Sequence, residues 1–221
     1  MKKDFSARPV SITEPWCTWQ GFLTAMPSLV FVVTGWKSNG KENACLQSWS
    51  TFVGGGRDDF FCIMGAVNTG GHMYCSLKET GVCVLNFPSF DIYDRCIKTI
   101  GNNGWETDEI TAAGMTAEPA VKVNAPRIKE CFLNIECEFL WEQSLSKEAG
   151  FFGDHNVTVA LKAVNFCMDS ERYDQSKLGR YGKTGYLLQI DNPTNPETGE
   201  RTESVWVGTV ETEYPFGWVT K

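Results

Sequence analysis

The strongest indication of the fold comes from Pro27–Gly54, PSLVFVVTGWKSNGKENACLQSWSTFVG. It opens with an unbroken apolar run, residues 29–33, which is rich in β-branched and aromatic side chains and too short for a stable helix. The sequence Ser38-Asn39-Gly40 follows and favours a tight reversal, because Asn and Gly tolerate positive φ angles. The stretch therefore predicts a buried central strand from which the chain doubles back.

Polar and small side chains dominate after this reversal. They are Asn43, Ala44, Cys45, Gln47, Ser48, Trp49, Ser50 and Thr51. Such residues pack a core poorly, but they offer amides, hydroxyls and close backbone approach to a ligand. Composition alone leaves two interpretations open: a ligand site, or a solvated strand with its turn.

A second polar segment ends the next apolar run, residues 60–67. Asn68-Thr69-Gly70-Gly71 breaks that run, and a helical pattern begins at His72 and stops at Gly81. The N-terminus of a helix attracts phosphate, so Thr69 and His72 are candidate phosphate contacts. The alternative is that His72 is a capping or surface residue.

The remaining elements indicate antiparallel β-structure. We expect a strand at 82–87, a helix capped by Ser89 that reaches Ile100, a loop at 102–127 with a short helix at 110–113, and strands at 131–141, 157–163, 186–190 and 205–210. No long amphipathic helix separates the two alternating strands, which favours a Greek-key arrangement over repeated β-α units. The loop at 102–127 is expected to lie over the barrel edge.

Charge and composition exclude several classes of protein. The chain has 20 basic and 27 acidic residues, a formal net charge of −7, which argues against a nucleic-acid surface. No run approaches the roughly 20 apolar residues of a membrane-spanning helix, so we expect a soluble cytoplasmic protein with no membrane partner. Nine cysteines without a Cys-x-x-Cys pair are interpreted as mostly buried thiols, and no metal site is expected.

The Asn39-Gly40 turn, Asn43-Ala44 and Ser48-Trp49 together resemble the opening of the flavin reductase-like FMN-binding split barrels, the group that includes flavoredoxin. The similarity continues through residues 72–89 and reaches Asp154-His155. The resemblance implies a mainly β fold, a Greek-key FMN-binding split barrel with a few capping helices. It also implies noncovalent FMN and a homodimer whose flavins sit near the subunit interface.

The same resemblance implies a set of flavin contacts. They are Asn43, Ala44, Cys45, Gln47, Ser48, Trp49, Ser50, Thr51, Thr69, His72, Tyr74, Asn86, Asp154 and His155. His72 and Tyr74 depart from the basic residue and threonine that the family commonly has there. Asn86 could instead bond local backbone at a strand end, and Asp154 could be a turn residue beside an exposed histidine.

The expected reaction is hydride transfer from NADH or NADPH to FMN, with electrons passed to free flavin, an iron complex or a protein. No catalytic side chain is expected, because the flavin ring itself accepts the hydride. Two alternatives remain open: a flavoredoxin-type electron carrier reduced by a protein partner, and a non-catalytic cofactor-binding domain. We expect one domain over residues 1–221, with an N-terminal arm at 1–26 and a C-terminal extension at 169–221 that packs on the barrel or the dimer.

Overall fold

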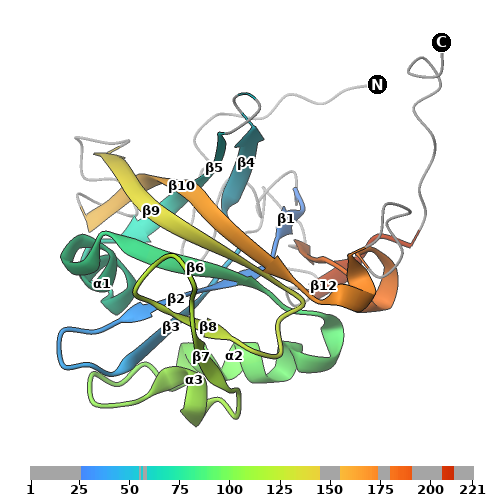
Figure 1. The fold of residues 1–221 in the computed structure, drawn as a ribbon, viewed down its shortest axis with the longest axis horizontal. Helices are drawn as coiled ribbons and strands as arrows, with labels where there is room; N and C mark the ends of the chain where they lie inside the picture. The colour runs from blue at the N-terminus through green and yellow to red at the C-terminus, as the bar shows by residue number, and fades with distance from the viewer. Residues whose placement is uncertain are drawn as a thin grey trace, which may run out of the picture.

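A seven-stranded antiparallel sheet forms the centre of the molecule, in the order β3-β2-β6-β9-β10-β5-β4 (Figure 1). This computed structural model describes residues 26–54, 56, 59–144, 155–173, 180–190 and 206–211. The seven strands are β2 (Phe31–Trp36), β3 (Glu42–Gln47), β4 (Ser50–Gly54), β5 (Phe60–Asn68), β6 (Val82–Phe87), β9 (Leu133–Ser144) and β10 (Asn156–Met168).

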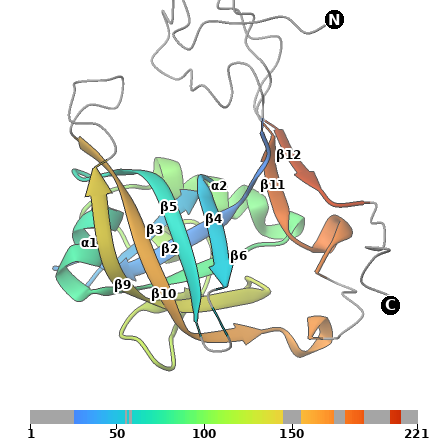
Figure 2. The same cartoon turned by 90° about the horizontal axis from the view of Figure 1, so that it is seen from above.

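Two smaller sheets and a few helices surround the large sheet. The small sheets join β1 (Ser28–Leu29) to β11 (Leu187–Ile190) and β12 (Trp206–Thr209), and β7 (Ala117–Pro119) to β8 (Pro126–Ile128). The helices are α1 (His72–Thr80), α2 (Tyr93–Gly101) and α3 (Glu109–Ala112), with 3-10 turns at Phe90–Ile92, Ser170–Arg172 and Gly182–Thr184. Figures 1 and 2 place β11 and β12 at the far end of the molecule from α1.

The large sheet curls because its two edge strands are neighbours in the chain. Only residues 48–49 separate β3 from β4, yet these strands lie at opposite edges of the sheet. The sheet must bend round to bring the edges together, and among the described residues no ladder joins β3 to β4. The result is a barrel with an open seam, and the predicted mainly β, Greek-key split barrel is confirmed.

Apolar residues on the two faces of the sheet build separate clusters. Inside the barrel, Phe31, Met64 and Leu85 are fully buried, and the Phe31 ring lies 5.4 Å from that of Phe87. On the outer face, Val32 packs with residues of α2 and α3, including Ile110. The two clusters follow from the alternation of side chains along β2, which explains why α2 and α3 lie against this end of the sheet.

Most element predictions are confirmed, with shifts that have physical causes. The apolar run at 29–33 is divided between β1 and β2, because the Val30 N–H leaves the large sheet to bond the Leu187 carbonyl at 2.9 Å. Helix α1 begins at His72 as expected and ends before Gly81, which has a φ of 71°. The short helix expected at 110–113 lies at Glu109–Ala112.

Ser89 occupies the predicted N-cap position, but its side chain does not cap the helix. Ser89 makes no side-chain bond to the helix backbone; its hydroxyl bonds the Asp91 carboxylate instead. The hydroxyl donates to this neighbouring carboxylate and accepts no backbone N–H, and the helix starts as the 3-10 turn Phe90–Ile92 before α2 begins.

Three other expectations concern the cysteines, membrane-spanning helices and the domain boundaries. The predicted buried thiols include Cys62, Cys83, Cys96, Cys131 and Cys137, all of which are buried. Within the described ranges, no helix is long and apolar enough to cross a membrane. The division into one domain at 1–221 stays a prediction, and the arm up to residue 25 lies outside the described residues.

Candidate functional site

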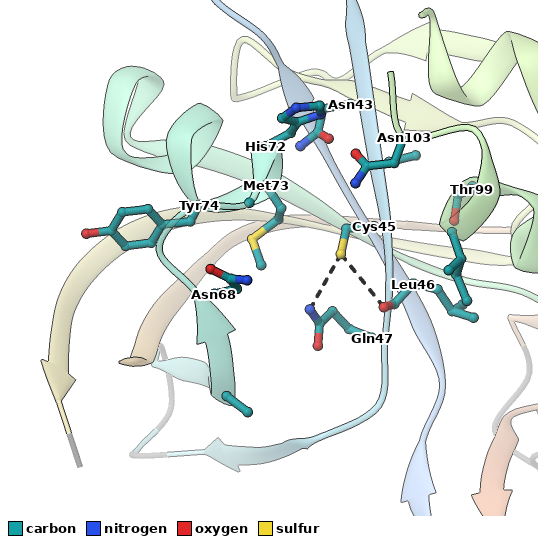
Figure 3. Close-up of a pocket in the computed structure, with 14 residues that line it drawn as sticks. Asn43, Cys45, Leu46, Gln47, Asn68, His72, Met73, Tyr74, Thr99 and Asn103 are labelled. Atoms are coloured by element: carbon teal, nitrogen blue, oxygen red, sulfur yellow. Dashed lines mark hydrogen bonds between the residues drawn. The ribbon is translucent and has the colours of Figure 1, made fainter. Parts of the chain in front are cut away.

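A hollow of about 330 Å³ lies where β3, the end of β5, the start of α1 and the end of α2 meet (Figure 3). Its volume is at the lower end of the roughly 300–1,000 Å³ that small-molecule sites occupy. Six of the predicted site residues line it: Asn43, Ala44, Cys45, Gln47, His72 and Tyr74. We call it the β3–α1 cavity.

Strand β3 supplies one wall of the cavity and is an edge strand of the large sheet. Side-chain alternation puts Asn43, Cys45 and Gln47 on one face of the strand. On its outer edge, the Glu42 N–H donates to Asp108 Oδ1 at 3.2 Å and the Ala44 N–H to Glu109 Oε2 at 2.7 Å. The same alternation turns the next outward N–H, that of Leu46, toward the open seam beside the cavity.

Asn43 brings an unsatisfied amide to the cavity wall. The residue is 2 % exposed, and its Nδ2 has no hydrogen-bond partner within the described part of the chain. Leaving a buried donor unpaired costs about 1–3 kcal/mol, and native structures keep few such groups. Figure 3 shows this amide beside His72, so an acceptor on a bound molecule would satisfy it.

Cys45 lies at the centre of the cavity wall as a neutral thiol. Burial raises the pKa of this thiol above its usual value, although the neighbouring Gln47 amide acts in the opposite direction. The Gln47 Nε2 lies 3.6 Å from the Cys45 Sγ, and this Sγ lies 3.8 Å from the Leu46 carbonyl oxygen (Figure 3). A thiol held neutral is a poor nucleophile, so Cys45 contributes packing surface.

Helix α1 points its uncapped start at the same hollow. Gly71 precedes the helix in extended conformation, with no side-chain cap bond, and the first turn carries no acidic residue. The amide groups of this turn and the helix dipole therefore favour an anion there. Tyr74 contributes its ring only, because its hydroxyl donates to Glu142 Oε1 at 3.1 Å and turns away from the cavity (Figure 3).

The end of β5 is strained where it meets the cavity. Ala66 has a φ of 52°, in the left-handed region that L residues rarely adopt. It lies in a β-bulge: Val67 pairs with Val157 and Met64 with Val159, so β5 has one residue more than β10 between these pairs. The bulge redirects the chain so that Ala66 and Asn68 both line the cavity.

A buried ion pair lies beside the cavity, next to β3 and the start of α1. Lys37 Nζ lies 2.8 Å from Glu109 Oε1, and both side chains are fully buried. The same ammonium donates to the carbonyls of Gly104 and Thr107, each at 2.7 Å. The expected loop over the barrel edge is therefore fastened through Lys37, and within it the Trp105 ring lies 5.1 Å from that of His72.

Several predicted contacts do not line the cavity. The Ser48 hydroxyl donates to Gln189 on β11, and the chain then leaves the cavity through Trp49 and enters β4 with Ser50 and Thr51. The Thr69 N–H donates to the His155 carbonyl at 2.7 Å, which ties both residues to the neighbouring turn. Asp154 lies outside the described residues.

Asn86 is held in a polar network inside the sheet. It is fully buried; its Nδ2 donates to the Val32 carbonyl at 2.9 Å, and its Oδ1 accepts from the Ile128 N–H at 2.8 Å and from Asn134. Its amide hydrogens and its oxygen are thus used by protein partners. Of the alternative, local backbone bonding, the structure shows one bond, from Nδ2 to the Val84 carbonyl at 3.1 Å; the other partners are distant in sequence.

Sequence reasoning missed part of the cavity lining. The missed residues are Leu46, Ala66, Asn68, Gly71, Met73, Thr99, Ile100 and Asn103. Asn68, Gly71 and Met73 adjoin predicted residues, so their positions in the chain pointed to them. Nothing in the pattern of α2 pointed to the end of that helix, because its approach to β3 is a tertiary contact.

A larger hollow of about 640 Å³ lies elsewhere on the barrel. Apolar residues such as Phe60, Leu133, Ile135 and Phe166 line much of it, and it includes none of the predicted contacts. None of its lining residues has an unpaired buried side-chain donor within the described chain. The smaller β3–α1 cavity therefore has the features of a polar ligand site.

Comparison with known proteins identifies the family. Residues 23–183 match the sequence model of the flavin reductase like domain. A curated protein of Methanothermobacter thermautotrophicus is 32% identical over 63 residues, which cover 28% of this chain and 30% of that protein. The matched segment is thus less than a third of that relative.

Solved structures share the fold over most of the chain. Flavoredoxin of Desulfovibrio vulgaris has a TM-score of 0.68 at 15% identity and covers 100% of this chain and 99% of its own. An FMN-binding protein from Thermus thermophilus has a TM-score of 0.68 at 15% identity, covering 97% and 100%. A candidate flavin reductase with a split barrel domain from Shewanella frigidimarina has a TM-score of 0.66 at 16% identity, covering 87% and 88%.

Proposed function

Because the chain belongs to the flavin reductase-like domain family, we propose that its β3–α1 cavity binds FMN noncovalently and that the protein is an NAD(P)H-dependent flavin reductase. The matched residues 23–183 include the whole lining of the cavity. The observation that carries the proposal is the unpaired, buried Asn43 amide beside the uncapped start of α1. A hydrogen-bond donor and an anion-binding helix end in one hollow suit a ligand with a polar ring and a phosphate.

The residues present fit the needs of a flavin. Its polar ring edge needs amides, which Asn43, Gln47 and the Leu46 N–H offer. Its phosphate suits the first turn of α1, where Gly71 leaves the backbone open. Its apolar ring face needs a wall without charge, and Met73 is a buried member of the lining.

The chain's own residues have the tasks of binding and orientation. FMN, when bound, supplies the chemistry, since its ring accepts a hydride from a nicotinamide and passes electrons on. Amide donors along β3 would hold the ring and face the oxygen and nitrogen atoms where reduction builds negative charge. The neutral Cys45 thiol provides contact surface without competing as a nucleophile.

Partners and location are part of the proposal. The donor is NADH or NADPH, and the acceptor is a small molecule or a protein redox partner. The proposed protein is a cytoplasmic homodimer, because a hollow of only about 330 Å³ on one chain would gain walls from a second subunit. Sedimentation at micromolar concentration should give the mass of two chains, with or without FMN; a single-chain mass in both states would remove the dimer from the proposal.

Reconstitution with FMN tests the proposed function directly. The purified protein should bind FMN with quenching or shifting of the flavin spectrum, and denaturation should release the cofactor unchanged. Anaerobic NADH or NADPH should then bleach the flavin absorbance. Absence of FMN binding at micromolar concentration would refute the flavin site, whereas binding without bleaching would favour the flavoredoxin-type carrier.

A further inference from the structure

Glu109, at the start of α3, is the centre of a buried cluster that borders the β3–α1 cavity. Its carboxylate contacts Lys37 Nζ at 2.8 Å, the Ala44 N–H at 2.7 Å and His72 Nδ1 at 3.5 Å. These contacts come from the β2–β3 turn, from β3 and from α1. One fully buried side chain thus joins the β2–β3 turn to β3 and α1, two of the elements that line the cavity.

Every hydrogen-bond donor of the Lys37 ammonium group has an acceptor. Its ammonium has three donors, which are used by Glu109 and by the carbonyls of Gly104 and Thr107. The Lys37 and Glu109 charges balance each other. The charge of the Glu109 carboxylate is therefore already balanced by Lys37, and the contact with His72 is additional to this ion pair.

The contact to Glu109 determines which ring nitrogen of His72 carries hydrogen. An ionised carboxylate can only accept, so the Nδ1 that faces it must be the donor. The Trp105 ring lies edge-on at 5.1 Å and fixes the imidazole from another side. The second ring nitrogen, Nε2, has no hydrogen-bond partner among the described residues, and His72 lines the cavity.

We propose that Glu109 is a positioning residue of the ligand site, which holds hydrogen on His72 Nδ1 and so presents His72 Nε2 to the bound molecule. The inference rests on the proposed function for the identity of that molecule, FMN. The arrangement is that of a second carboxylate partner that fixes the tautomer and orientation of a working histidine. The loop at 104–107 supports the same arrangement, because Lys37 links its carbonyl groups to the Glu109 carboxylate.

The first test needs no flavin. Long-range nitrogen–proton NMR of the apo protein distinguishes the two tautomers, and the chain has only two histidines, so exposed His155 serves as an internal reference. Neutral His72 should carry hydrogen on Nδ1, and Glu109→Gln should shift it toward Nε2, because one amide oxygen cannot serve three donors. An unchanged His72 tautomer in a folded Glu109→Gln protein would overturn the inference.

Two further variants serve as controls for the tautomer test. Asp108→Asn is the matched control: Asp108 also joins α3 to β3, through Lys41 at 2.8 Å and the Glu42 N–H, but makes no contact with His72. It should leave the tautomer unchanged. Since Glu109→Gln strands a buried lysine charge and risks unfolding, Lys37→Met/Glu109→Gln removes both charges together and should give the same tautomer shift in a folded protein.

The second test measures coupling in FMN binding. His72→Ala should weaken FMN affinity about tenfold, the worth of one good hydrogen bond. Lys37→Met/Glu109→Gln should weaken it several-fold in the wild-type background and have no further effect when His72 is already Ala. Additive losses would mean that Glu109 acts by general support and would overturn the inference; absence of FMN binding by the wild type would refute the proposed function and leave the tautomer test to decide.

Discussion

The unpaired side-chain amide of Asn43 is the main observation that supports a ligand site. Its position on the first hairpin made it a candidate from sequence, because Asn after an Asn-Gly reversal is out of place in a core. Its missing partner could not be read from sequence, since that depends on which groups β2, α1 and α3 bring within reach. In the structure, the neighbouring Ala44 N–H donates a hydrogen bond to Glu109. The Asn43 Nδ2, in contrast, has no hydrogen-bond partner in the described chain.

Replacing Asn43 by Ala should weaken FMN binding about tenfold, because one hydrogen bond of roughly 1.4 kcal/mol is lost. Fluorescence titration of the apo protein measures this affinity. Asn124→Ala is the control, since Asn124 is exposed and lies outside the cavity. Equal affinities for wild type and Asn43→Ala would show that the amide does not face the ligand.

Ala66 is a residue whose strain could not be predicted, because alanine gives no sign of a left-handed backbone. At a φ of 52°, glycine avoids a steric cost of about 1–2 kcal/mol. Ala66→Gly should therefore raise the free energy of unfolding by about 1 kcal/mol once the greater freedom of glycine in the unfolded chain is deducted. Urea denaturation measures the change.

The matched control for Ala66 is Ala160→Gly. Ala160 is 1 % exposed in the middle of β10, where glycine has no backbone advantage, so this variant should be destabilised by about 1 kcal/mol. Loss of stability of similar size in both variants would mean that Ala66 is not strained.

At the scale of elements, sequence reasoning located most strands and α1, because periodicity and glycine stops are local signals. It could not find the links between distant elements. The Lys37–Glu109 pair joins a hairpin turn to α3, and both residues look like ordinary surface charges in the sequence. Glu136 is a similar case: it lies on alternating strand β9, where a glutamate is expected to face solvent, yet it is fully buried.

Glu136 fastens the loop between β7 and β8. Its carboxylate accepts the N–H groups of Val121 at 3.0 Å and Lys122 at 2.6 Å, and the Asn165 amide at 2.9 Å. Burial acts to raise the pKa of Glu136, but these donors outweigh it and hold the pKa below the usual 4.5. The charged form is therefore favoured in the folded protein.

This arrangement predicts a pH-dependent effect of Glu136→Gln. A lowered folded-state pKa gives stability that is present above the unfolded value of 4.5 and is lost as pH falls through the folded value. At pH 7 the variant should be less stable than wild type by about 2 kcal/mol, and the difference should shrink below pH 4.5.

Chemical denaturation between pH 3 and pH 7 checks the Glu136 prediction. Glu138→Gln is the control on the same strand, because Glu138 is exposed and should show little effect at any pH. A stability difference for Glu136→Gln that stays constant over this range would contradict a role for the charge.

At the scale of the whole molecule, the fold class could be predicted because the alternating strands lack intervening helices. The seam between β3 and β4 could not, since it depends on sheet order rather than on any one segment. If FMN fills the cavity beside this seam, it binds the folded state alone. At a free FMN concentration a hundred times the dissociation constant, the free energy of unfolding should rise by about 2.7 kcal/mol.

Thermal denaturation with and without FMN measures this gain. Asn43→Ala should show a smaller rise at the same FMN concentration, because its affinity is lower. A transition temperature that does not move with saturating FMN would contradict binding to the folded state.

The order of strands also governs when the cavity can exist during synthesis. Its walls come from β3 and β5, which belong to opposite halves of the large sheet, and among the described residues the ladders that join those halves run through β9 and β10. A nascent chain contains every lining residue once position 103 has left the ribosome, yet the sheet that contains both β3 and β5 is complete only when β10, which ends at Met168, has followed. If FMN is the ligand of this cavity, we therefore expect it to bind late in synthesis, and a ribosome-stalled fragment that stops before Leu133 should retain no FMN.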